Sequence, residues 1–268
     1  MPANPVGSAP MTPTTYGAVF AGGLFLGMLV LLELGRRIGT ARLARDPDGA
    51  QKGLGVVEGA VFSLLGLLIA FTFSGAATRF DGRRQLIVEE ANTIGTAYQR
   101  IDLLPDRVQP ALRDLFRQYL DARLETYRKM PDVAAMNVEL ARSRALQTAI
   151  WSYAIAACRE SGSQPAHMVL LPALNPMFDI ATTRVEAMSI HPPVIIFAMI
   201  GILSLAAALL AGYGMAGSRS RSWVHTVAFA GVMALTVYVI IDIEYPRFGW
   251  INVRGADRVL VELRESMK

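Results

Sequence analysis

Four long runs of apolar residues separate the charged segments of this chain. They cover residues 16–35, 56–77, 192–216 and 223–242. Each run is close to the roughly 20 residues that a helix needs to cross the hydrocarbon core of a bilayer. Aromatic or basic residues mark the ends of the runs, as they do at membrane surfaces. The pattern predicts a membrane protein with four transmembrane helices.

The polar residues gather in residues 78–190, between the second and third spans, and their pattern is helical. Over residues 106–129 the apolar positions recur mainly at spacings of three and four, which is one face of an amphipathic helix. A second helix is expected from about Val133 to Cys158, with Asp132 as its N-cap. These features predict a helical domain outside the membrane.

Prolines predict where the remaining helices end. Pro172 interrupts a weak helical segment over residues 165–175, and Pro176 is placed to open a further helix with Asn175 as its cap. By contrast, no proline occurs from Val56 to Leu104. The second span is therefore expected to continue past the membrane as one helix of 49 residues, about 70 Å long.

We therefore expect an all-α membrane protein with four transmembrane helices and a helical extramembrane bundle between spans two and three. The expected parts are a mobile tail (1–14), a transmembrane hairpin (15–77), the helical extramembrane domain (78–190), a second transmembrane hairpin (191–243) and a C-terminal amphipathic tail (244–268).

Composition agrees with this organisation. The chain is 53% hydrophobic and 18% charged, whereas soluble domains are typically about 25% charged. This excludes a disordered chain and disfavours an ordinary soluble enzyme. The net charge of +4 fits the excess of basic residues in membrane-protein loops, so we expect no nucleic-acid partner. One cysteine, Cys158, excludes an intramolecular disulfide.

No catalytic or metal-binding pattern stands out, so we expect no enzyme activity, metal or cofactor. The histidines His167, His191 and His225 do not pair at helical spacing. Glu89 and Glu90 are adjacent, but neighbours on a helix point about 100° apart. The simpler interpretation gives these carboxylates salt bridges with Arg83, Arg84 or another basic residue.

The second span carries a stripe that suggests a function. Its residues repeat at helical spacing and are Glu58, Phe62, Leu65, Ile69, Phe73, Ala76 and Phe80. In a symmetric oligomer such a face can line a pore, with an apolar constriction that gates by dewetting. Such stripes more often face lipid or pack against a neighbouring helix. Two glycine pairs, Gly23 with Gly27 and Gly55 with Gly59, allow close contact between helices.

Residues 64–105 resemble the signature of the bestrophin-like family of bacterial membrane proteins. The most specific parts are the blocks Phe71-Thr72-Phe73-Ser74 and Glu89-Glu90-Ala91-Asn92, with support from DIEYPRFG at residues 242–249. The motif residues are Phe71, Ser74, Arg79, Arg84, Glu89, Glu90, Asn92, Asp242 and Pro246.

The resemblance implies a homo-oligomeric ion channel, because bestrophins are homopentameric anion channels whose second span lines the pore. It favours Ile69, Phe73 and Ala77 as neck residues, although Ala77 is smaller than expected there. The resulting set of pore-lining candidates is Glu58, Phe62, Ile69, Phe73, Ala77 and Phe80. The calcium-binding acidic cluster of animal bestrophins has no counterpart in this sequence.

The implied partners are membrane lipid, further copies of the chain and small anions, in a bacterial inner membrane. Basic residues flank both ends of the spans in similar number, so the sequence does not settle the orientation. The resemblance places the helical domain in the cytoplasm. The alternative function is a membrane-anchored interaction or sensing module, in which the helical domain binds a protein and the spans only assemble it.

Overall fold

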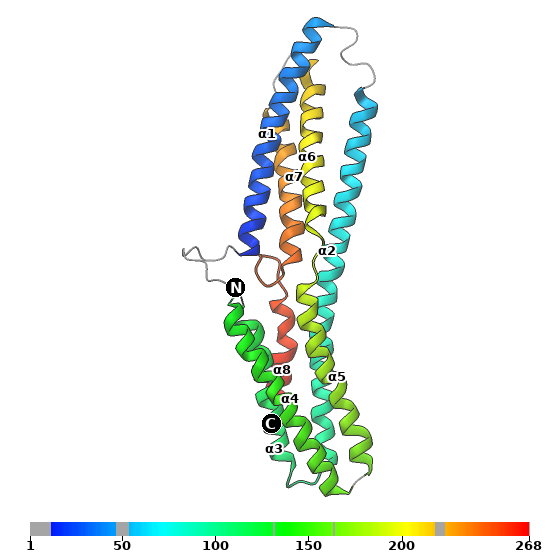
Figure 1. The fold of residues 1–268 in the computed structure, drawn as a ribbon, viewed down its shortest axis with the longest axis vertical. Coiled ribbons are helices and arrows are strands. Elements are labelled where there is room, and N and C mark those ends of the chain that lie inside the picture. The colour runs from blue at the N-terminus through cyan, green and yellow to red at the C-terminus, as the bar shows by residue number, and fades with distance from the viewer. Residues whose placement is uncertain (1–11, 47–53, 131, 163, 218–222, 268) are drawn as a thin grey trace, which may run out of the picture. The chain divides into compact units, whose positions relative to one another are not determined.

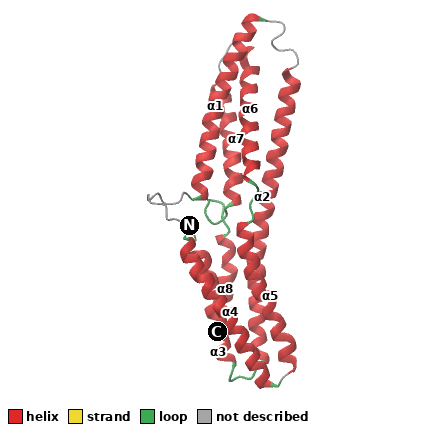
Figure 2. Cartoon of the chain, viewed as in Figure 1, coloured by secondary structure: helices red, strands yellow, loops and turns green. Residues whose placement is uncertain are grey.

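The computed structural model describes residues 12–46, 54–130, 132–162, 164–217 and 223–267, and its regular structure within these ranges is entirely helical (Figures 1 and 2). The helices are α1 (Pro13–Arg45), α2 (Leu54–Gln99), α3 (Gln109–Arg128), α4 (Val133–Ser161), α5 (Gln164–Ser189), α6 (Val194–Gly214), α7 (Trp223–Glu244) and α8 (Arg258–Ser266), with short 3-10 turns at Arg100–Leu103, Met215–Gly217 and Arg254–Asp257. The prediction of an all-α protein is confirmed.

The chain divides into two compact units. The first comprises Met1–Thr78 and Pro192–Ile251, and the second comprises Arg79–His191 and Asn252–Lys268. Four helical segments are long and apolar enough to cross a membrane, and they contain the four predicted spans. We call the first the membrane unit and the second the helical unit. The expected C-terminal tail, 244–268, is divided between the units, because residues up to Ile251 belong to the membrane unit and Asn252–Lys268 to the helical unit. The tail expected over residues 1–14 falls mostly outside the described residues.

In the membrane unit, α1 packs against α6 and α7, and the three helices lie side by side (Figure 1). Their shared core consists of Leu24, Met28 and Leu32 on α1, Ile200 and Ala208 on α6, and Ala230 and Val237 on α7. Thr12 caps α1, because its hydroxyl accepts a hydrogen bond from the Thr15 backbone N–H at 3.3 Å.

Three glycines bring the backbones of α1 and α6 into close contact. A Cβ on Gly35 would lie 2.9 Å from the Tyr213 backbone nitrogen, and one on Gly39 would lie 2.7 Å from the Tyr213 carbonyl oxygen. A Cβ on Gly212 would lie 2.9 Å from the Cα of Leu32. No side chain fits at these positions, so the helices approach as small-residue motifs allow in membranes.

The glycine pairs noted in the sequence are not the ones at this contact. A Cβ on Gly23, Gly55 or Gly59 would meet nothing within 4 Å, and one on Gly27 would touch only the Leu205 side chain, at 3.0 Å. The sequence pattern Gly-x-x-x-Gly therefore does not identify which pair packs, because the facing helix decides it.

In the helical unit, the predicted face of α3 is buried. Leu112, Phe116, Tyr119 and Leu120 are fully enclosed by apolar residues of α2, α4 and α5. Asp132 caps α4 as predicted, accepting a hydrogen bond from the Ala135 N–H at 3.0 Å. The helix ends where Gly162 adopts a left-handed conformation with φ of 58°.

The break predicted at the prolines is wrong, because α5 continues through both Pro172 and Pro176. Prolines lack an N–H, so the carbonyls of the residues four positions earlier lose their usual helical partners. Arg100 Nη1 donates to the Val169 carbonyl at 2.8 Å, which is the neighbour of the Met168 carbonyl that Pro172 leaves free. The continuous apolar face, with Leu170, Leu174 and Met177 buried, keeps the helix in place.

The segment after α7 docks on the helical unit through α8. Leu260 and Met267 are buried in its core. The guanidinium of Arg264 donates to both carboxylate oxygens of Asp121 on α3, at 2.8 and 3.1 Å. This bidentate pair is the strong form of such contacts, and it fixes the end of the chain on α3.

Candidate pore-lining helix

Among the four spans, α2 is the least covered by its own chain. Only 11% of the residues in its most apolar stretch are buried, compared with 28% in α1 and 22% in each of the other two. Between Val56 and Ala77 the buried residues of α2 are Leu65, Thr72 and Ala76. They recur at helical spacing and define one inward face.

Most of the predicted pore-lining residues lie on or beside this inward face. Phe62 packs edge-on against Phe229 of α7 with ring centroids 6.1 Å apart, and Ile69 contacts the core shared by α1, α6 and α7. Glu58 is half-buried beside Gly214, and its Oε1 has no hydrogen-bond partner among the described residues. Phe73 is 44% exposed. Ala77 and Phe80 are half-buried.

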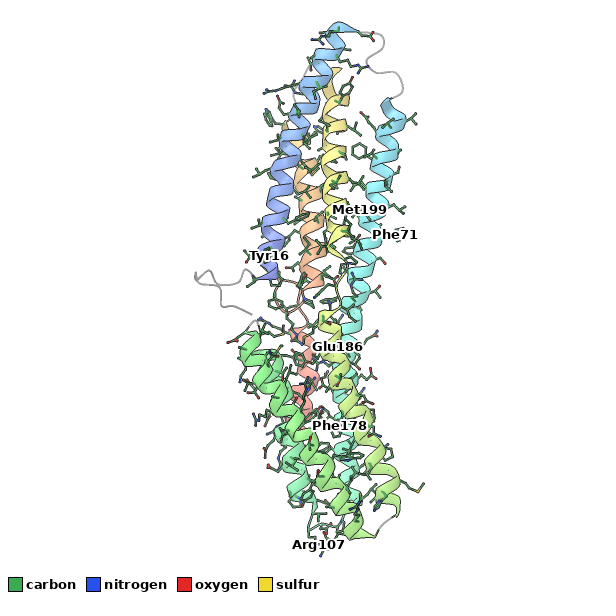
Figure 3. All side chains as sticks on the ribbon, in the orientation of Figure 1. Tyr16, Phe71, Arg107, Phe178, Glu186 and Met199 are labelled. Atoms are coloured by element: carbon green, nitrogen blue, oxygen red, sulfur yellow. The ribbon has the colours of Figure 1, made fainter. Side chains whose placement is uncertain are left out.

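The opposite side of α2 is exposed along its whole length, and we call it the exposed face. Its positions recur at spacings of three or four and are Val56, Ala60, Ser63, Leu67, Ala70, Ser74, Thr78, Asp81, Gln85, Val88 and Asn92. Within the membrane-crossing part most of these residues are small or carry a hydroxyl. The Thr78 hydroxyl donates to the Ser74 carbonyl at 2.9 Å. Phe71, labelled in Figure 3, lies at the edge of this face and is 68% exposed.

Large aliphatic side chains are exposed on α2 as well, where Val56 and Leu67 lie on the exposed face and Val57 and Leu64 lie elsewhere on the helix, but they are more numerous on the other three spans together. On those spans they include Val19, Leu26 and Val30 on α1, Val194, Ile195 and Ile202 on α6, and Val224, Val232 and Leu235 on α7. Such residues suit contact with lipid tails, whereas small and hydroxyl-bearing residues suit another protein surface or water. Within the membrane-crossing part, the exposed face of α2 therefore carries more small and hydroxyl-bearing residues than large aliphatic ones.

Two of the motif carboxylates behave in opposite ways. Glu89 is exposed, whereas Glu90 is fully buried in the helical unit. One Glu90 oxygen accepts a hydrogen bond from Arg123 Nε at 2.5 Å, and the other accepts one from Arg184. Glu90 is therefore salt-bridged, as the simpler interpretation of the sequence predicted. Its partners are Arg123 and Arg184 rather than Arg83 or Arg84.

Further contacts complete this buried cluster. Arg123 Nη2 donates to the Tyr127 hydroxyl at 2.9 Å, and the Arg184 guanidinium lies over the Tyr127 ring at 4.0 Å. Arg184 also approaches Asp257, at 3.7 Å, in the segment that follows α7. The cluster joins α2, α3 and α5 to the C-terminal segment in the core of the helical unit.

The charges of the cluster fix its protonation. Burial alone would raise the pKa of Glu90, but Arg123 and Arg184 outweigh it and hold the pKa below its ordinary value. Burial raises the pKa of Tyr119, which receives a hydrogen bond from Gln147, to about 12. Glu90 is thus ionised at neutral pH, with both of its oxygens engaged, and is unsuited to proton transfer.

The sequence suggested Arg83 as a salt-bridge partner of Glu89 or Glu90, but its contacts in the structure are with backbone carbonyls. Its guanidinium donates to the Ala187 carbonyl at 3.0 Å and to the Ile190 carbonyl at 2.9 Å, at the end of α5. A cation at a helix C-terminus satisfies free carbonyls and complements the helix dipole. Its neighbour Arg84 is exposed and pairs with Asp81.

A comparison with protein families decides the identity of the chain. The model described as the Bestrophin-like domain matches residues 22–256. The chain belongs to the Bestrophin-like family. The solved structures that it resembles include two variants of a bacterial Bestrophin homolog from Klebsiella pneumoniae, one with a tryptophan and one with a tyrosine replaced by alanine.

The likeness to the Klebsiella proteins extends over nearly the whole chain. For the tryptophan variant it covers 91% of this chain and 95% of the other at 14% identity, with a TM-score of 0.65. For the tyrosine variant it covers 89% and 98% at 13% identity, with a TM-score of 0.62. At this identity the likeness shows the fold alone. No curated protein matched the chain in a sequence comparison.

The last motif of this Bestrophin-like protein forms a tight loop after α7. Asp242 is buried, and its carboxylate accepts hydrogen bonds from the backbone N–H groups of Trp250 at 3.2 Å and Ile251 at 2.8 Å. Gly249 lies against this carboxylate, where a Cβ would clash. Pro246 is buried in the same loop. Over the described residues, no three His, Cys, Asp or Glu side chains gather closely enough to hold a metal ion.

Proposed function

We propose that this Bestrophin-like chain forms a homo-oligomeric channel for small anions, expected to be a pentamer, in a bacterial inner membrane with the helical unit in the cytoplasm. The exposed face of α2 lines the conduit. Family membership supports an ion channel, and the small, hydroxyl-bearing surface of α2 is the observation that carries the choice of lining helix.

The exposure of each side chain refines the set of lining residues. Phe62 and Ile69 contact other helices of the same chain, so we assign them to packing. Leu67 and Phe71 are 53% and 68% exposed and lie one turn apart. We assign the apolar constriction to these two residues, because a narrow apolar ring can close a pore by dewetting. Phe73, at 44% exposure, is the most exposed of the original pore-lining candidates.

The test is a cysteine-accessibility experiment on the reconstituted oligomer. The only native cysteine, Cys158, is buried, and replacing it with alanine gives a background free of thiols. Single cysteines at Ser63 and Ser74, on the exposed face, should react with charged methanethiosulfonates and change the chloride current. Cysteines at Leu65 and Ala76, on the inward face, should not.

Two matched alanine substitutions test which phenylalanine forms the constriction. Phe71→Ala should raise the chloride conductance or leave the pore open more of the time, whereas Phe73→Ala should have the smaller effect. A stable oligomer that carries no current across salts, pH values and voltages would refute the channel. Currents altered only from the inward-face positions would refute the assignment of the lining face.

A further inference from the structure

Adjacent arginines beyond the membrane-crossing part of α2 have different surroundings. Arg83 is buried and is committed to the carbonyls at the end of α5. Arg84 is exposed, with 56% of its side chain accessible, and its partner Asp81 is 63% accessible. The difference indicates that only Arg83 serves the packing of the helical unit.

The Asp81–Arg84 pair contributes little to the fold. The two side chains are separated by 3.4 Å and lie one turn apart on the same helix. Exposed pairs of this kind contribute little to stability, because water screens the attraction and holding two long side chains in place costs entropy. Arg84 also lies over the ring of Phe80, 6.0 Å from its centroid, a contact that holds the guanidinium near the helix surface without burying it.

The position of Asp81 is more informative. It continues the exposed face at the spacing set by Ser74 and Thr78, and lies about 10 Å beyond Ser74 along the helix. Residues 59–78 contain no charged side chain. The next residue, Arg79, is half-buried and lies outside the exposed face, so Asp81 is the first exposed charge on this face beyond the membrane-crossing part of α2.

We propose that Asp81 and Arg84 set the charge selectivity of the channel. This inference rests on the proposed function. In a symmetric oligomer each residue forms a ring, and rings of acidic or basic side chains favour cations or anions respectively. The two rings lie side by side and oppose each other, so Arg84 offsets the repulsion that Asp81 exerts on anions. Native selectivity is the balance between them.

Removing one charge at a time should shift selectivity in opposite directions. Asp81→Asn leaves the Arg84 ring and should raise the ratio of chloride to sodium permeability. Arg84→Gln leaves the Asp81 ring and should lower that ratio. We expect each change to be at least about fivefold, which corresponds to about 1 kcal/mol. The ratio is obtained from the reversal potential of the purified oligomer in planar bilayers under a potassium-free sodium chloride gradient.

The chain offers a matched control on α3. Glu125 and Arg128 form an exposed pair of the same spacing at 3.1 Å, on a different helix from the proposed pore-lining α2. Glu125→Gln and Arg128→Gln make the same charge changes and should leave the reversal potential unaltered. A parallel shift in the control variants would reduce the effect to net charge and overturn the proposal.

A chemical modification gives a second measurement on protein already folded. Asp81→Cys in the Cys158→Ala background is treated with a positively or a negatively charged methanethiosulfonate. The two reagents should move the reversal potential in opposite directions. If all of these variants conduct with unchanged selectivity, the proposed role of Asp81 and Arg84 is wrong, while the proposal that the protein is a channel is retained. A wild-type oligomer that does not conduct overturns both.

Discussion

Replacing Glu90 with glutamine should destabilise the helical unit strongly. The substitution keeps the size of the side chain but removes the negative charge between Arg123 and Arg184. These guanidiniums are 1% and 4% exposed, so water cannot solvate them in place of the carboxylate. Breaking a buried ion pair by removing one partner costs about 3–5 kcal/mol, because a charge is left buried without compensation.

The expected change can be followed through the single cysteine. Cys158 is fully buried in the core of the helical unit, so a thiol-reactive fluorophore reports when that core opens on heating. At about 2–8 °C per kcal/mol, the midpoint should fall by at least about 6 °C. Glu89→Gln is the matched control, because the Glu89 carboxylate is exposed. It should shift the midpoint by less than about 2 °C.

A combined variant separates charge from packing. Replacing Glu90 with leucine and both arginines with methionine removes every charge of the triad at similar volume. Apolar replacement of buried ion pairs is often neutral or stabilising, so this variant should recover most of the loss. If Glu90→Gln melts within about 1 °C of the wild type, or if the triple variant is the least stable of all, the reasoning from uncompensated charge is wrong.

Three further outcomes follow from the contacts. Gly35→Ala should prevent α1 from seating on α6 and lower the yield of folded protein in detergent, whereas Gly22→Ala, which meets open space, should not. Asp242→Ala should lower the melting midpoint, since two backbone N–H groups lose their acceptor at about 1–3 kcal/mol. Folding lowers the pKa of Glu90, so the stability that its ionised form contributes should be complete above about pH 4.5 and be lost as the pH falls through the pKa of the folded state. Melting the wild type and Glu90→Gln across pH tests this expectation.

The regular elements were largely predictable because their signals are local. Apolar run length located the four spans, the absence of proline predicted the long α2, and Asp132 marked the start of α4. The prolines of α5 misled because a weakened turn is tolerated where packing compensates, as the buried Leu170, Leu174 and Met177 do here. Local propensity does not contain that compensation.

The site was less predictable, since its decisive contacts join distant residues. Periodicity identified a face of α2 but not which side the remaining helices cover, and Leu65, Thr72 and Ala76 settle that point. Likewise, Glu90 was recognisable as part of a motif, whereas its partners lie 33 and 94 residues further along the chain. Arg123 and Arg184 carried no signal that distinguished them from other helical arginines.

The glycine contact between α1 and α6 also constrains how the protein can be made. Gly35 and Gly212 are separated by 177 positions (212 − 35), so at about 5–20 residues per second the ribosome needs about 10–35 s to supply the second helix. During that interval the glycine surface of α1 at Gly35 and Gly39 is in the bilayer without the α6 backbone that will contact it. Insertion machinery that covers this glycine surface would preserve it for α6 and allow correct assembly. A second nascent α1 that binds there first would instead pair prematurely with the helix.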